Sequence, residues 1–480
     1  MVSEARNRLG PNCLGPNRRG ALGTLGALGA LAASGTLPGP AAASALPRVA
    51  IVGAGMAGMA CAWLLDGAYD ISLFEAGAQI GGNVQSLPLS VDGQDLIVDV
   101  GAQYFHPGPY PNYVALLGQL GLYPPSTGGS HVFNASITVD DAAEAQPRFV
   151  SPVLPGRAWP LLAPRNRSGI QAFSTMFRAA QRRENNDASW QLTLGDWLPT
   201  LNLTPAQIDT MLLPWIASLY SGDIDETRSL SARAALVVAA KALPPNPTDP
   251  LQYYVLDRGM VDPLNRMAAQ FSSVALHTAA PVSAVSRLPQ GGFRVQAAGL
   301  PAQDVDQVVF ASSGPPTSAL LQGLPGTALQ RAALQAMRFF DATLAIHTDA
   351  AYVAQQPAWR SFLNCRVQGP FCEASMDLAR VLPAGAVPLP PLWKSWVTHR
   401  AAPPAAPLHV AQFRHMLPNL ATLHAQQLLA PLQGQGGLWF AGGYLLPFDA
   451  QESALLSAMA VAQSLNPAGA RLAGLRQRAT

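Results

Sequence analysis

Apolar and polar positions near the start of the chain fall into blocks that predict a strand, a tight turn, a helix and a second strand. Residues 48–52 form a short β-branched run, which is typical of a parallel strand buried on both faces. Residues 56–65 form an apolar segment of helix-forming residues, and residues 70–74 form the second strand. The pattern therefore predicts a strand–turn–helix–strand unit at the start of a parallel sheet.

The turn of this unit carries the spacing Gly-x-Gly-x-x-Gly at residues 53–58. Gly53 allows the sharp turn, Gly55 lets a pyrophosphate approach the backbone, and Gly58 lets the helix pack close to the strand. A phosphate would bind the unpaired N–H groups at the helix start, where the helix dipole favours negative charge. Glu75 closes the second strand, where a carboxylate can accept the ribose hydroxyls of an adenosine. A purely structural turn is the alternative, but these parts in register favour a dinucleotide site.

Glycines also mark the segments that follow. Gly81-Gly82 lies just beyond the ribose acid, where adjacent glycines let the backbone pass close to a phosphate or ring of a ligand. A predicted strand at 96–100 leads into Gly101, Ala102, Gln103, Tyr104 and Phe105, and a helix is predicted over 109–121. The glycine-rich part of the chain therefore extends well past the first turn.

The next segment, from about 125 to 250, changes character. It has proline-rich loops and then helical patterns at 168–182, 194–201, 205–221 and 230–242. A proline cluster at 244–250 marks its end. The pattern predicts a mostly helical insertion that could form a cap over the cofactor.

Strand patterns return after residue 270. The predicted strands are 274–277, 280–286 paired with 293–297, and 305–311. Residues 324–432 form a second inserted block with strands at 343–347 and 393–398, which we expect to belong to a separate sheet. A strand at 437–441 ends at Gly442-Gly443, a helix follows at 453–465, and the basic tail at 467–480 is expected to be disordered.

Length and composition bear on the number of domains and argue against nucleic-acid-binding and disulfide-rich proteins. A chain of 480 residues predicts two domains, or one domain with a large insertion. The formal net charge is +2 and only 12% of residues are charged, which argues against a nucleic-acid partner. Four cysteines are too few for a disulfide framework and lack metal-ligand spacing, so we expect no metal. Cys365 and Cys372 could pair if the compartment is oxidising.

The first 45 residues are typical of a targeting segment. Arg18-Arg19 precedes a mildly apolar stretch at 21–33, and residues 43–45 offer a small-x-small cleavage site, as in a bacterial twin-arginine signal. This predicts export to the periplasm or beyond, while a disordered leader on a cytoplasmic protein is the alternative. No later apolar run is long enough for a membrane span, so the mature protein is expected to be soluble.

Together these motifs resemble the flavin-containing amine oxidoreductases, the superfamily of monoamine oxidase, protoporphyrinogen oxidase and phytoene desaturase. Within it, the chain is most similar to bacterial NAD/FAD-binding oxidoreductases of unassigned substrate. The resemblance implies an FAD cofactor and an α/β fold: a discontinuous, Rossmann-type FAD-binding domain with an inserted α+β substrate domain and helical cap. The expected division is a leader at 1–45, FAD-binding pieces at 46–124, 251–323 and 433–466, a cap at 125–250, a substrate block at 324–432, and a tail at 467–480.

The resemblance also implies which residues hold the cofactor. Arg258-Gly259-Met260 is similar to a glycine turn before the middle cofactor helix, and Val282 falls where the family presents a valine to the adenine. Gly442 and then Ser457 on a helix match the C-terminal flavin contact. The expected FAD-binding residues are Gly53, Gly55, Met56, Ala57, Gly58, Glu75, Ala76, Gly81, Gly82, Asn83, Gly101, Ala102, Gln103, Val282, Gly442, Gly443, Ser453 and Ser457.

Four departures from the family pattern limit what the resemblance implies: the first weakens the expected phosphate clamp, and the other three argue against amine oxidation. Gln79 and Asn83 stand where arginines often flank the paired glycines, and no lysine lies near Thr343, where the family's catalytic lysine is expected. Tyr444 stands where many members have glutamate, and Ala450 lies near the place of an aromatic-cage tyrosine.

No residue emerges from the sequence as the catalytic one. Tyr104, His106 and Tyr444 are weak candidates, for which a structural hydrogen bond or core packing is the alternative. His347 and Asp349 could form a pair or simply satisfy a turn, and Glu452 could simply charge the start of the last helix.

The sequence thus predicts an FAD-dependent oxidoreductase. It would take a hydride from a small, apolar or weakly polar organic substrate and return the electrons to oxygen or another acceptor. Two alternatives stay open: a redox-neutral isomerase or saturase acting on a lipid-like chain, and a protein that binds FAD without turnover. The sequence does not indicate an oligomeric state.

Overall fold

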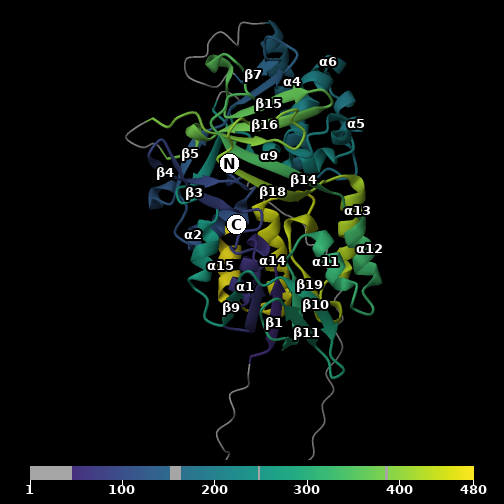
Figure 1. Ribbon diagram of the computed structural model, residues 1–480. Helices are drawn as coiled ribbons and strands as arrows, with labels where there is room; N and C mark the ends of the chain where they lie inside the picture. The colour runs from purple at the N-terminus through teal and green to yellow at the C-terminus, as the bar shows by residue number, and fades with distance from the viewer. Residues whose placement is uncertain (1–45, 152–163, 247–248, 384–387, 480) are drawn as a thin grey trace, which may run out of the picture. The chain divides into compact units, whose positions relative to one another are not determined.

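A computed structural model describes residues 46–151, 164–246, 249–383 and 388–479 (Figure 1). The leader at 1–45, with its twin-arginine-like pair, lies outside the described residues, as does the segment at 152–163. Residues from Leu46 onward form one compact unit.

The predicted parallel sheet is present and has five strands. Its order is β19 (Leu438–Phe440), β13 (Gln307–Phe310), β1 (Arg48–Val52), β2 (Asp70–Phe74) and β9 (Val274–His277), and all neighbours are parallel. The strands come from three stretches of chain that are far apart in sequence. The α/β fold class and the discontinuous sheet are therefore confirmed.

Successive residues of β1 point to opposite faces of this sheet, as the two-residue period of a strand requires. Val49 and Ile51 belong to an apolar core shared with α1 (Met56–Leu65) and α14 (Gln451–Leu465), which lie side by side in Figure 1. Ala50 and Val52 belong to a second core on the other face. That core contains residues of the small antiparallel sheet β10 (Val282–Arg287), β11 (Phe293–Ala297) and β12 (Gln303–Val305), and of α11 (Gly314–Leu321), α12 (Ala328–Ala336) and α13 (Leu420–Leu429).

A second large sheet has seven strands. Its order is β18 (His409–Met416), β14 (Phe339–His347), β17 (Trp393–Trp396), β16 (Phe371–Asp377), β15 (Leu363–Gln368), β6 (Ile137–Asp141) and β7 (Phe149–Val150). Neighbours are antiparallel except for the parallel pair β15–β6. The inserted blocks at 125–250 and 324–432 therefore build one sheet together.

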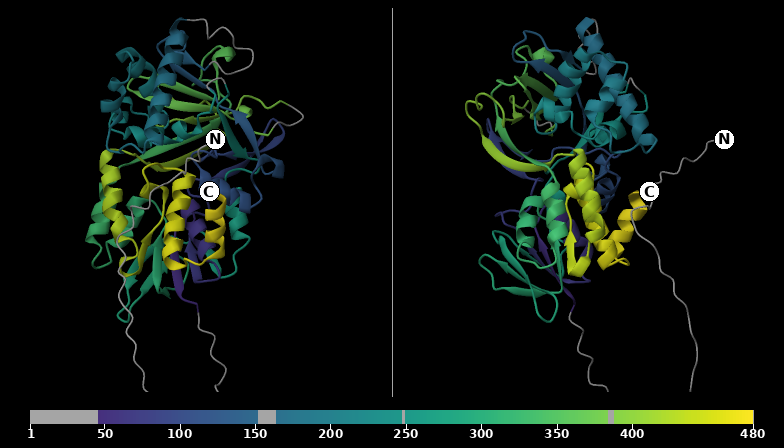
Figure 2. Two further views of the ribbon diagram at one scale, coloured as in Figure 1. Left: turned by 180° about the vertical axis from the view of Figure 1, so that it is seen from behind. Right: turned by 90° about the vertical axis from the view of Figure 1, so that its right-hand side faces the viewer.

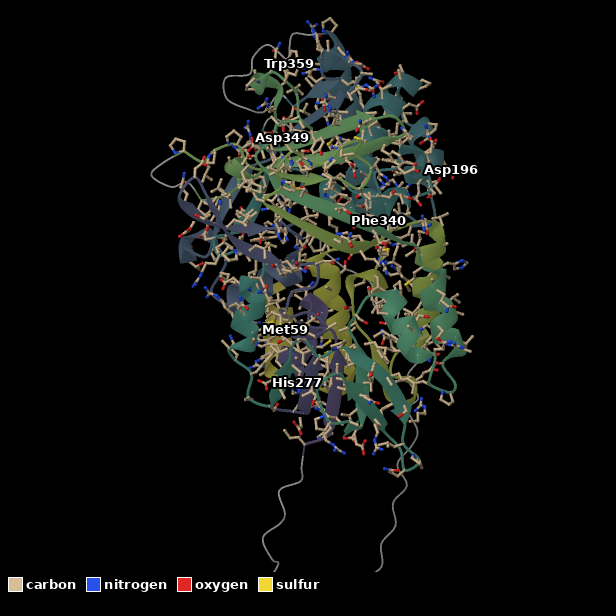
Figure 3. The ribbon with its side chains drawn as sticks, viewed as in Figure 1. Met59, Asp196, His277, Phe340, Asp349 and Trp359 are labelled. Carbon is tan, nitrogen blue, oxygen red and sulfur yellow. The ribbon has the colours of Figure 1, made fainter. Side chains whose placement is uncertain are left out.

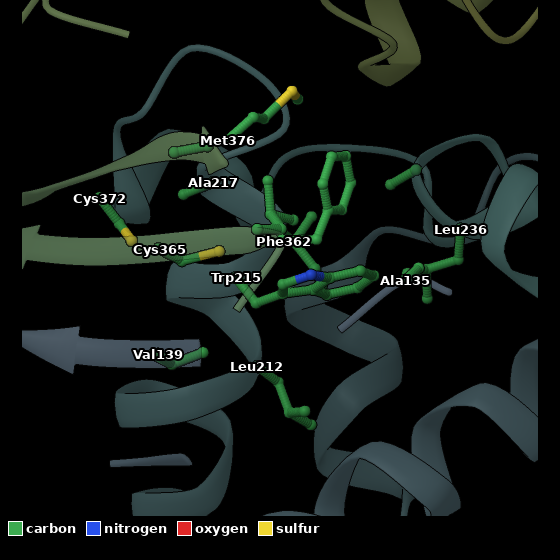
Figure 4. Close-up of a cluster of buried hydrophobic side chains, with 14 of the residues drawn as sticks. Ala135, Val139, Leu212, Trp215, Ala217, Leu236, Phe362, Cys365, Cys372 and Met376 are labelled. Carbon is green, nitrogen blue, oxygen red and sulfur yellow. The ribbon is translucent and has the colours of Figure 1, made fainter. Parts of the chain in front are cut away.

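Helices from the first inserted block pack against this sheet. Trp215, Leu212 and Ala217 of the α7 region (Leu213–Ala217) meet Cys365 and Cys372 of β15 and β16 in a buried apolar cluster (Figure 4). The longer helices α4 (Pro164–Asn185) and α9 (Ala232–Ala242) pack against each other nearby, as Figure 2 shows. The predicted helices at 168–182 and 230–242 are confirmed with shifted ends.

The described part of the block at 125–250 is mostly helical, as expected, but it also contributes strands that the sequence pattern did not predict. These are β6, β7 and β5 (Ser130–Asn134), which pairs with β8 (Gln252–Leu256). Thr138 and Asp140 alternate with Ile137 and Val139 in β6, and these polar residues are buried too. The tail was expected to be disordered, but Ala470–Ala479 forms α15, whose Leu472 and Leu475 are buried.

Three further features of the described residues bear on earlier expectations. Cys61, Cys365 and Cys372 are buried free thiols, so Cys365 and Cys372 do not form a disulfide. None of the described helices combines the length and apolar character needed to cross a membrane. Across the described ranges, no group of three or more His, Cys, Asp and Glu side chains could hold a metal ion.

Candidate flavin site

The first glycine loop has the geometry expected for a close helix–strand turn. Gly53 has a φ of +108°, and a Cβ there would lie 2.9 Å from the carbonyl carbon of Ala311. A Cβ on Gly58 would lie 1.8 Å from the carbonyl oxygen of Gly53, so only glycine fits. A Cβ on Gly55 would meet nothing closer than 3.7 Å. Gly53 and Gly58 therefore serve the fold, while the backbone at Gly55 is open to a ligand.

Met56 and Ala57 begin α1 and are buried, and no side chain caps the helix start at Gly55. The N–H groups of this first turn are consequently free for an anionic group, whose charge the helix dipole stabilises. These free N–H groups at the start of α1 fit a pyrophosphate.

Glu75 stands at the end of β2, beside the loop. Its Oε2 accepts a hydrogen bond from Ala54 N at 2.8 Å, and its Oε1 accepts one from Gly77 N, across Ala76, also at 2.8 Å. A carboxylate has about four acceptor positions, so acceptor capacity remains for two ribose hydroxyls. Val282, the expected adenine contact, is half-buried at the start of β10 and packs on the core that contains Phe74 of β2.

The second glycine pair packs on the first loop. Gly81 N donates to Ala54 O at 3.0 Å, and Gly55 and Gly81 form an isolated parallel bridge. Both residues of the pair have positive φ, +135° at Gly81 and +58° at Gly82. Asn83 follows, and its Nδ2 donates to the carbonyl of Arg414 on β18 at 3.2 Å. The pair thus carries the chain from the phosphate loop to the seven-stranded sheet.

The turn at Gly101, Ala102 and Gln103 lies against this segment. Ala102 N donates to Asn83 O at 2.9 Å, and a Cβ on Gly101 would lie 2.1 Å from that same oxygen. Gln103 is buried, and its Oε1 has no hydrogen-bond partner within the described chain. A buried acceptor without a partner is costly, so a donor from a bound group would fit here.

A buried lysine reaches this turn from the seven-stranded sheet. Lys394 Nζ on β17 donates to Gly101 O at 2.8 Å and to Asp99 O at 3.2 Å. Burial lowers the pKa of Lys394 and raises the pKa of Asp99, while the attraction between the two groups opposes both shifts. Asp99 in turn accepts hydrogen bonds from Ser86 Oγ at 2.5 Å and Met260 N at 2.7 Å. No lysine lies in β14 around Thr343, but the neighbouring strand supplies one.

The C-terminal glycine turn is anchored by the last long helix. Gly442 N donates to Ser457 Oγ at 2.8 Å, and Ser453 Oγ donates to Phe448 O at 2.5 Å. Helix α14 has no side-chain cap at Ala450, so its first N–H groups and positive dipole end are available. Glu452 lies in the first turn of α14, as expected, but its carboxylate accepts hydrogen bonds from Asn112 and Tyr113 at the start of another helix, α2 (Pro111–Gln119).

Strand register places five side chains on one face of the seven-stranded sheet. Phe340 pairs with His415, and Ala342 with Phe413, while Leu344 pairs with Trp396 and Ile346 with Lys394. Paired and alternate residues share a face of a sheet. Phe340, Phe413, His415, Trp396 and Lys394 therefore look toward the Gly101 turn, and Phe413 lies against Gly101, 3.3 Å from where its Cβ would be. Figure 3 labels Phe340 on this sheet.

Sequence reasoning missed His415 on this face and the carboxylate beside it, Asp449. His415 Nδ1 lies 3.4 Å from Asp449 Oδ2 and 3.4 Å from Asn83 Nδ2. Asp449 is beside Gly443, whose Cβ would lie 2.4 Å from Asp449 Oδ1. The rings of Phe340 and Trp396 lie 5.7 and 6.2 Å from His415. Asn83, His415 and Asp449 are far apart in sequence and come together only in the fold, so no linear motif indicated this cluster.

Tyrosines complete the apolar lining next to the Gly101 turn. Tyr104 makes edge contacts with Tyr253 at 4.8 Å and Phe362 at 5.9 Å. Burial raises the pKa of Tyr104 to about 12. Burial also raises the pKa of Tyr220, and the charge of nearby Asp449 adds to that effect. These phenols stay protonated at neutral pH and offer neutral hydrogen-bonding groups.

The other candidates are held in structural surroundings, although the buried hydroxyl of Tyr444 has no hydrogen-bond partner among the described residues. His106 Nδ1 accepts from Gly108 N at 3.0 Å, and burial lowers the pKa of His106 to about 4. Tyr444 is buried in the core, 6.1 Å from Phe339. His347 Nε2 contacts Ser395 Oγ at 2.8 Å on the opposite face of the sheet, and Asp349 accepts from Ala351 N in a turn.

A polar cavity of about 360 Å³ lies elsewhere. It is lined by Arg48, Asp70, Ser72 and residues 302–305, at the amino ends of β1 and β2. The glycine loops stand at the carboxyl ends, where ligands bind open α/β sheets. The cavity is therefore separate from the cofactor site.

Comparisons with known proteins agree with this geometry. The solved structures that resemble the chain include a putative protoporphyrinogen oxidase from Exiguobacterium sp. 255-15, with a TM-score of 0.56, 16% identity, and coverage of 87% of this chain and 98% of that one. Putrescine oxidase bound to putrescine gives a TM-score of 0.56 at 16% identity over 87% and 98% of the two chains. Cyclohexylamine oxidase from Brevibacterium oxydans gives 0.55 at 17% identity over 87% and 99%. No curated protein sequence matches.

A family model for flavin-containing amine oxidoreductases matches residues 56–347, which is more than half of the 480-residue chain. The cofactor of this family is FAD, and the uncapped helix starts, Glu75 and the partnerless Gln103 Oε1 all fit it. The chain therefore belongs to the flavin-containing amine oxidoreductases and is an FAD-dependent oxidoreductase.

Proposed function

We propose that this oxidoreductase oxidises a small, apolar or weakly polar organic molecule by hydride transfer to FAD, and passes the electrons to oxygen or another acceptor. One observation carries the proposal: the Gly101 turn, Asn83 and the C-terminal glycine turn meet an aromatic face of the seven-stranded sheet. A flat ring system held by these turns would have Tyr104, Phe340 and Trp396 on its substrate side. FAD, once bound, would supply the hydride-accepting chemistry.

The chain's own residues account for binding and electrostatics. Residues of the first loop and Glu75 would hold the adenosine and pyrophosphate, and the start of α14 would place backbone donors and a positive dipole end near negative charge. Lys394 places a further buried amine at the Gly101 turn, where burial lowers its pKa and the charge of Asp99 opposes that shift. A reduced flavin carries added negative charge, so these groups favour the reduced state.

The lining supports an apolar or weakly polar substrate. Phe340, Phe413 and Trp396 offer ring faces, and Tyr104 and Tyr253 offer neutral hydroxyls. Ala450 precedes the first turn of α14 and supplies only a methyl group and no ring, so a pair of tyrosines around an amine is not formed there. Putrescine oxidase and cyclohexylamine oxidase, by their names, act on amines. We propose a different substrate class for this chain.

Purification and anaerobic reduction test the proposal. The protein should be yellow, release FAD on denaturation, and bleach with dithionite. A library of amines, alcohols, polyenes and acyl compounds should contain members that bleach the bound flavin without oxygen. Substrate conversion without net acceptor consumption would instead indicate an isomerase or saturase. Bound FAD that no library member reduces would support binding without turnover, and a folded protein with no releasable FAD would overturn the proposal.

We also propose that the protein is exported by a twin-arginine route, on the evidence of Arg18-Arg19 and residues 21–45. Such a route carries folded proteins and so suits a flavoprotein loaded in the cytoplasm. Expression in a bacterium with this export system should place the yellow protein in the periplasm, and the double substitution R18K/R19K should retain it inside. Equal distribution of both forms would contradict export.

A further inference from the structure

His415 and Asp449 form an imidazole–carboxylate pair beside the cofactor turns. Nδ1 of His415 faces Oδ2 of Asp449 at 3.4 Å, and the side chains are 27% and 25% exposed. The pair is reachable from solvent, unlike the fully buried Lys394. Catalytic hydrogen bonds are often long before substrate binds and shorten in the complex.

The surroundings fix which nitrogen of His415 is free. Asn83 Nδ2 also approaches Nδ1 at 3.4 Å, but one of its two N–H groups donates to Arg414 O at the shorter distance of 3.2 Å. A carboxylate is the stronger acceptor, so the assigned tautomer has Nδ1–H donating to Asp449. Asp449 Oδ2 is itself held by Met416 N at 3.3 Å. Nε2 forms no hydrogen bond with any residue that the structure describes, and is left as an acceptor.

The position of Nε2 is set by packing. The imidazole lies between the rings of Phe340, Trp396 and Phe413, at centroid distances of 5.7, 6.2 and 6.3 Å. All four side chains are on the sheet face that looks toward the Gly101 turn. A carboxylate that orients an imidazole whose other nitrogen faces a substrate site is the arrangement of a general base.

We propose that His415 is a catalytic base, oriented by Asp449, and that the substrate carries a hydroxyl on the carbon that is oxidised. The inference rests on the proposed function. A neutral amine can lose hydride with its lone pair assisting, and needs no base at that step. A hydroxyl is a very weak acid, so its oxidation requires a group that takes its proton. The pair therefore favours an alcohol over an amine.

The step balances. The O–H bond breaks and its proton moves to Nε2 of His415, the C–H bond breaks and its hydride moves to oxidised FAD, and the C–O single bond becomes a carbonyl. The alcohol loses two electrons, which go with the hydride to FAD. Asp449 stabilises the imidazolium until the proton passes to solvent.

Anaerobic flavin reduction with matched probes tests the substrate class. The probes are 1-phenylethanol, its methyl ether, 1-phenylethylamine and cyclohexanol, because a benzylic ring suits the aromatic lining. At least one alcohol should bleach the flavin at ten times the rate of the ether and the amine. Reduction by the amine or ether at an equal or greater rate, or by none of the alcohols, would overturn the assignment.

Variants test the base itself. H415F keeps a ring in the packing and should slow reduction by alcohol at least 100-fold, and D449N should slow it about tenfold, while dithionite reduction stays unchanged. Among the described residues, Asp449 is the carboxylate within 4 Å of His415. Of the other ionisable groups nearby, Asp341 is paired with Arg414, and Tyr220 and Tyr104 stay protonated. H424Q, at an exposed helix position, is the matched control and should show neither effect.

A labelling experiment gives a readout that does not depend on turnover. Diethyl pyrocarbonate acylates a neutral imidazole, and mass spectrometry locates the label. His415 should react, acetophenone as a ketone ligand should protect it at least fivefold, and D449N should lower its reactivity. His424 should react with no protection. An unreactive or unprotected His415, or a reaction rate unchanged in D449N, would overturn the pair.

The outcomes separate this inference from the proposed function. A folded wild-type protein that contains no flavin would overturn the proposed function, independently of any result for His415. Flavin that is reduced by a library compound at the same rate in H415F and wild type would end only the proposal for His415.

Discussion

Buried polar groups are satisfied differently in the glycine-loop region and on the polar face of the seven-stranded sheet, the face that carries His347, Ser395 and Ser375. Around Gly53, Gly55 and Gly81, contacts are made by backbone atoms, and missing side chains create the space. On the sheet face that includes His347, buried polar side chains satisfy one another: His347 contacts Ser395 at 2.8 Å, and Ser395 donates to Ser375 at 2.7 Å. The comparison indicates that the first region leaves space for a ligand, whereas the second is filled by its own polar side chains.

The buried ion pair of the polar face gives the largest expected effect. Arg400 Nε lies 3.3 Å from Glu373 Oε2, both side chains are 2% exposed, and Arg400 also donates to Glu373 O at 2.7 Å. R400M leaves the carboxylate buried without its partner, which should lower the free energy of unfolding by about 3–5 kcal/mol. Urea denaturation monitored by tryptophan fluorescence would measure this.

The matched control is R414M on the same sheet. Arg414 and Asp341 form an ion pair that is 45% and 66% exposed, so its loss should cost less than about 1 kcal/mol. Equal losses for the two variants would show that burial does not distinguish these pairs. R400M should keep the affinity for FAD in whatever fraction remains folded, because the pair is far from the glycine loops in sequence and shares no hydrogen bond with them.

In the glycine-loop region, G58A should be the most disruptive single change. Its Cβ would lie 1.8 Å from Gly53 O, and backbone cannot move aside as a flexible side chain can. We expect a loss of about 3 kcal/mol in unfolding free energy together with loss of bound FAD. Thermal unfolding and the flavin absorbance per protein are the measurements. A stable, flavin-free G58A would indicate that this glycine serves the ligand alone.

G55A sharpens the contrast between the two glycines. Its Cβ meets nothing within 3.7 Å, and Gly55 has a φ of −76°, which alanine adopts readily. The stability of the FAD-free protein should change by less than about 0.5 kcal/mol. Affinity for FAD should fall about 10- to 100-fold, or about 1.4–2.8 kcal/mol, because the methyl group occupies the space of the pyrophosphate. Unchanged affinity in a fluorescence titration would place the phosphates elsewhere.

The smallest expected effect concerns pH and His106. Burial lowers the pKa of His106 to about 4, below the ordinary value of 6.5. Between these values the unfolded chain binds more protons, so stability falls as pH drops from 6.5 to 4. For a partly exposed ring this share is on the order of 1–2 kcal/mol. H106Q should lose that share of the pH dependence, measured by urea unfolding at pH 7 and pH 4.5, whereas H424Q should keep it.

The sequence was sufficient for the cofactor half because its signals are local. Gly53 to Glu75 act within one strand–turn–helix–strand unit, and the predicted strands at 274–277 and 437–441 are found as β9 and β19. Gly442 and Ser457 could be added only through the family resemblance, and they meet in a hydrogen bond of 2.8 Å.

The substrate half depends on contacts that no local pattern records. Thr138 and Asp140 are buried in a strand beside polar groups from far along the chain: Thr138 donates to Ser361 at 2.8 Å, and Arg366 lies 3.3 Å from Asp140. His415 joins Asp449 and Asn83 only when three segments fold together. Leu472 and Leu475 form a buried stripe too short to stand out within a basic tail.

The placement of Lys394 bears on how related chains are compared. Lys394 lies directly opposite Ile346 in the β14–β17 pair, so either strand can present a side chain to the same spot beside Gly101. An exchange in which position 346 of β14, rather than position 394 of β17, carries the lysine would therefore keep the amine at this spot. A sequence alignment would record such an exchange as the loss of a lysine. A structural superposition would show the amine still in place, on the neighbouring strand.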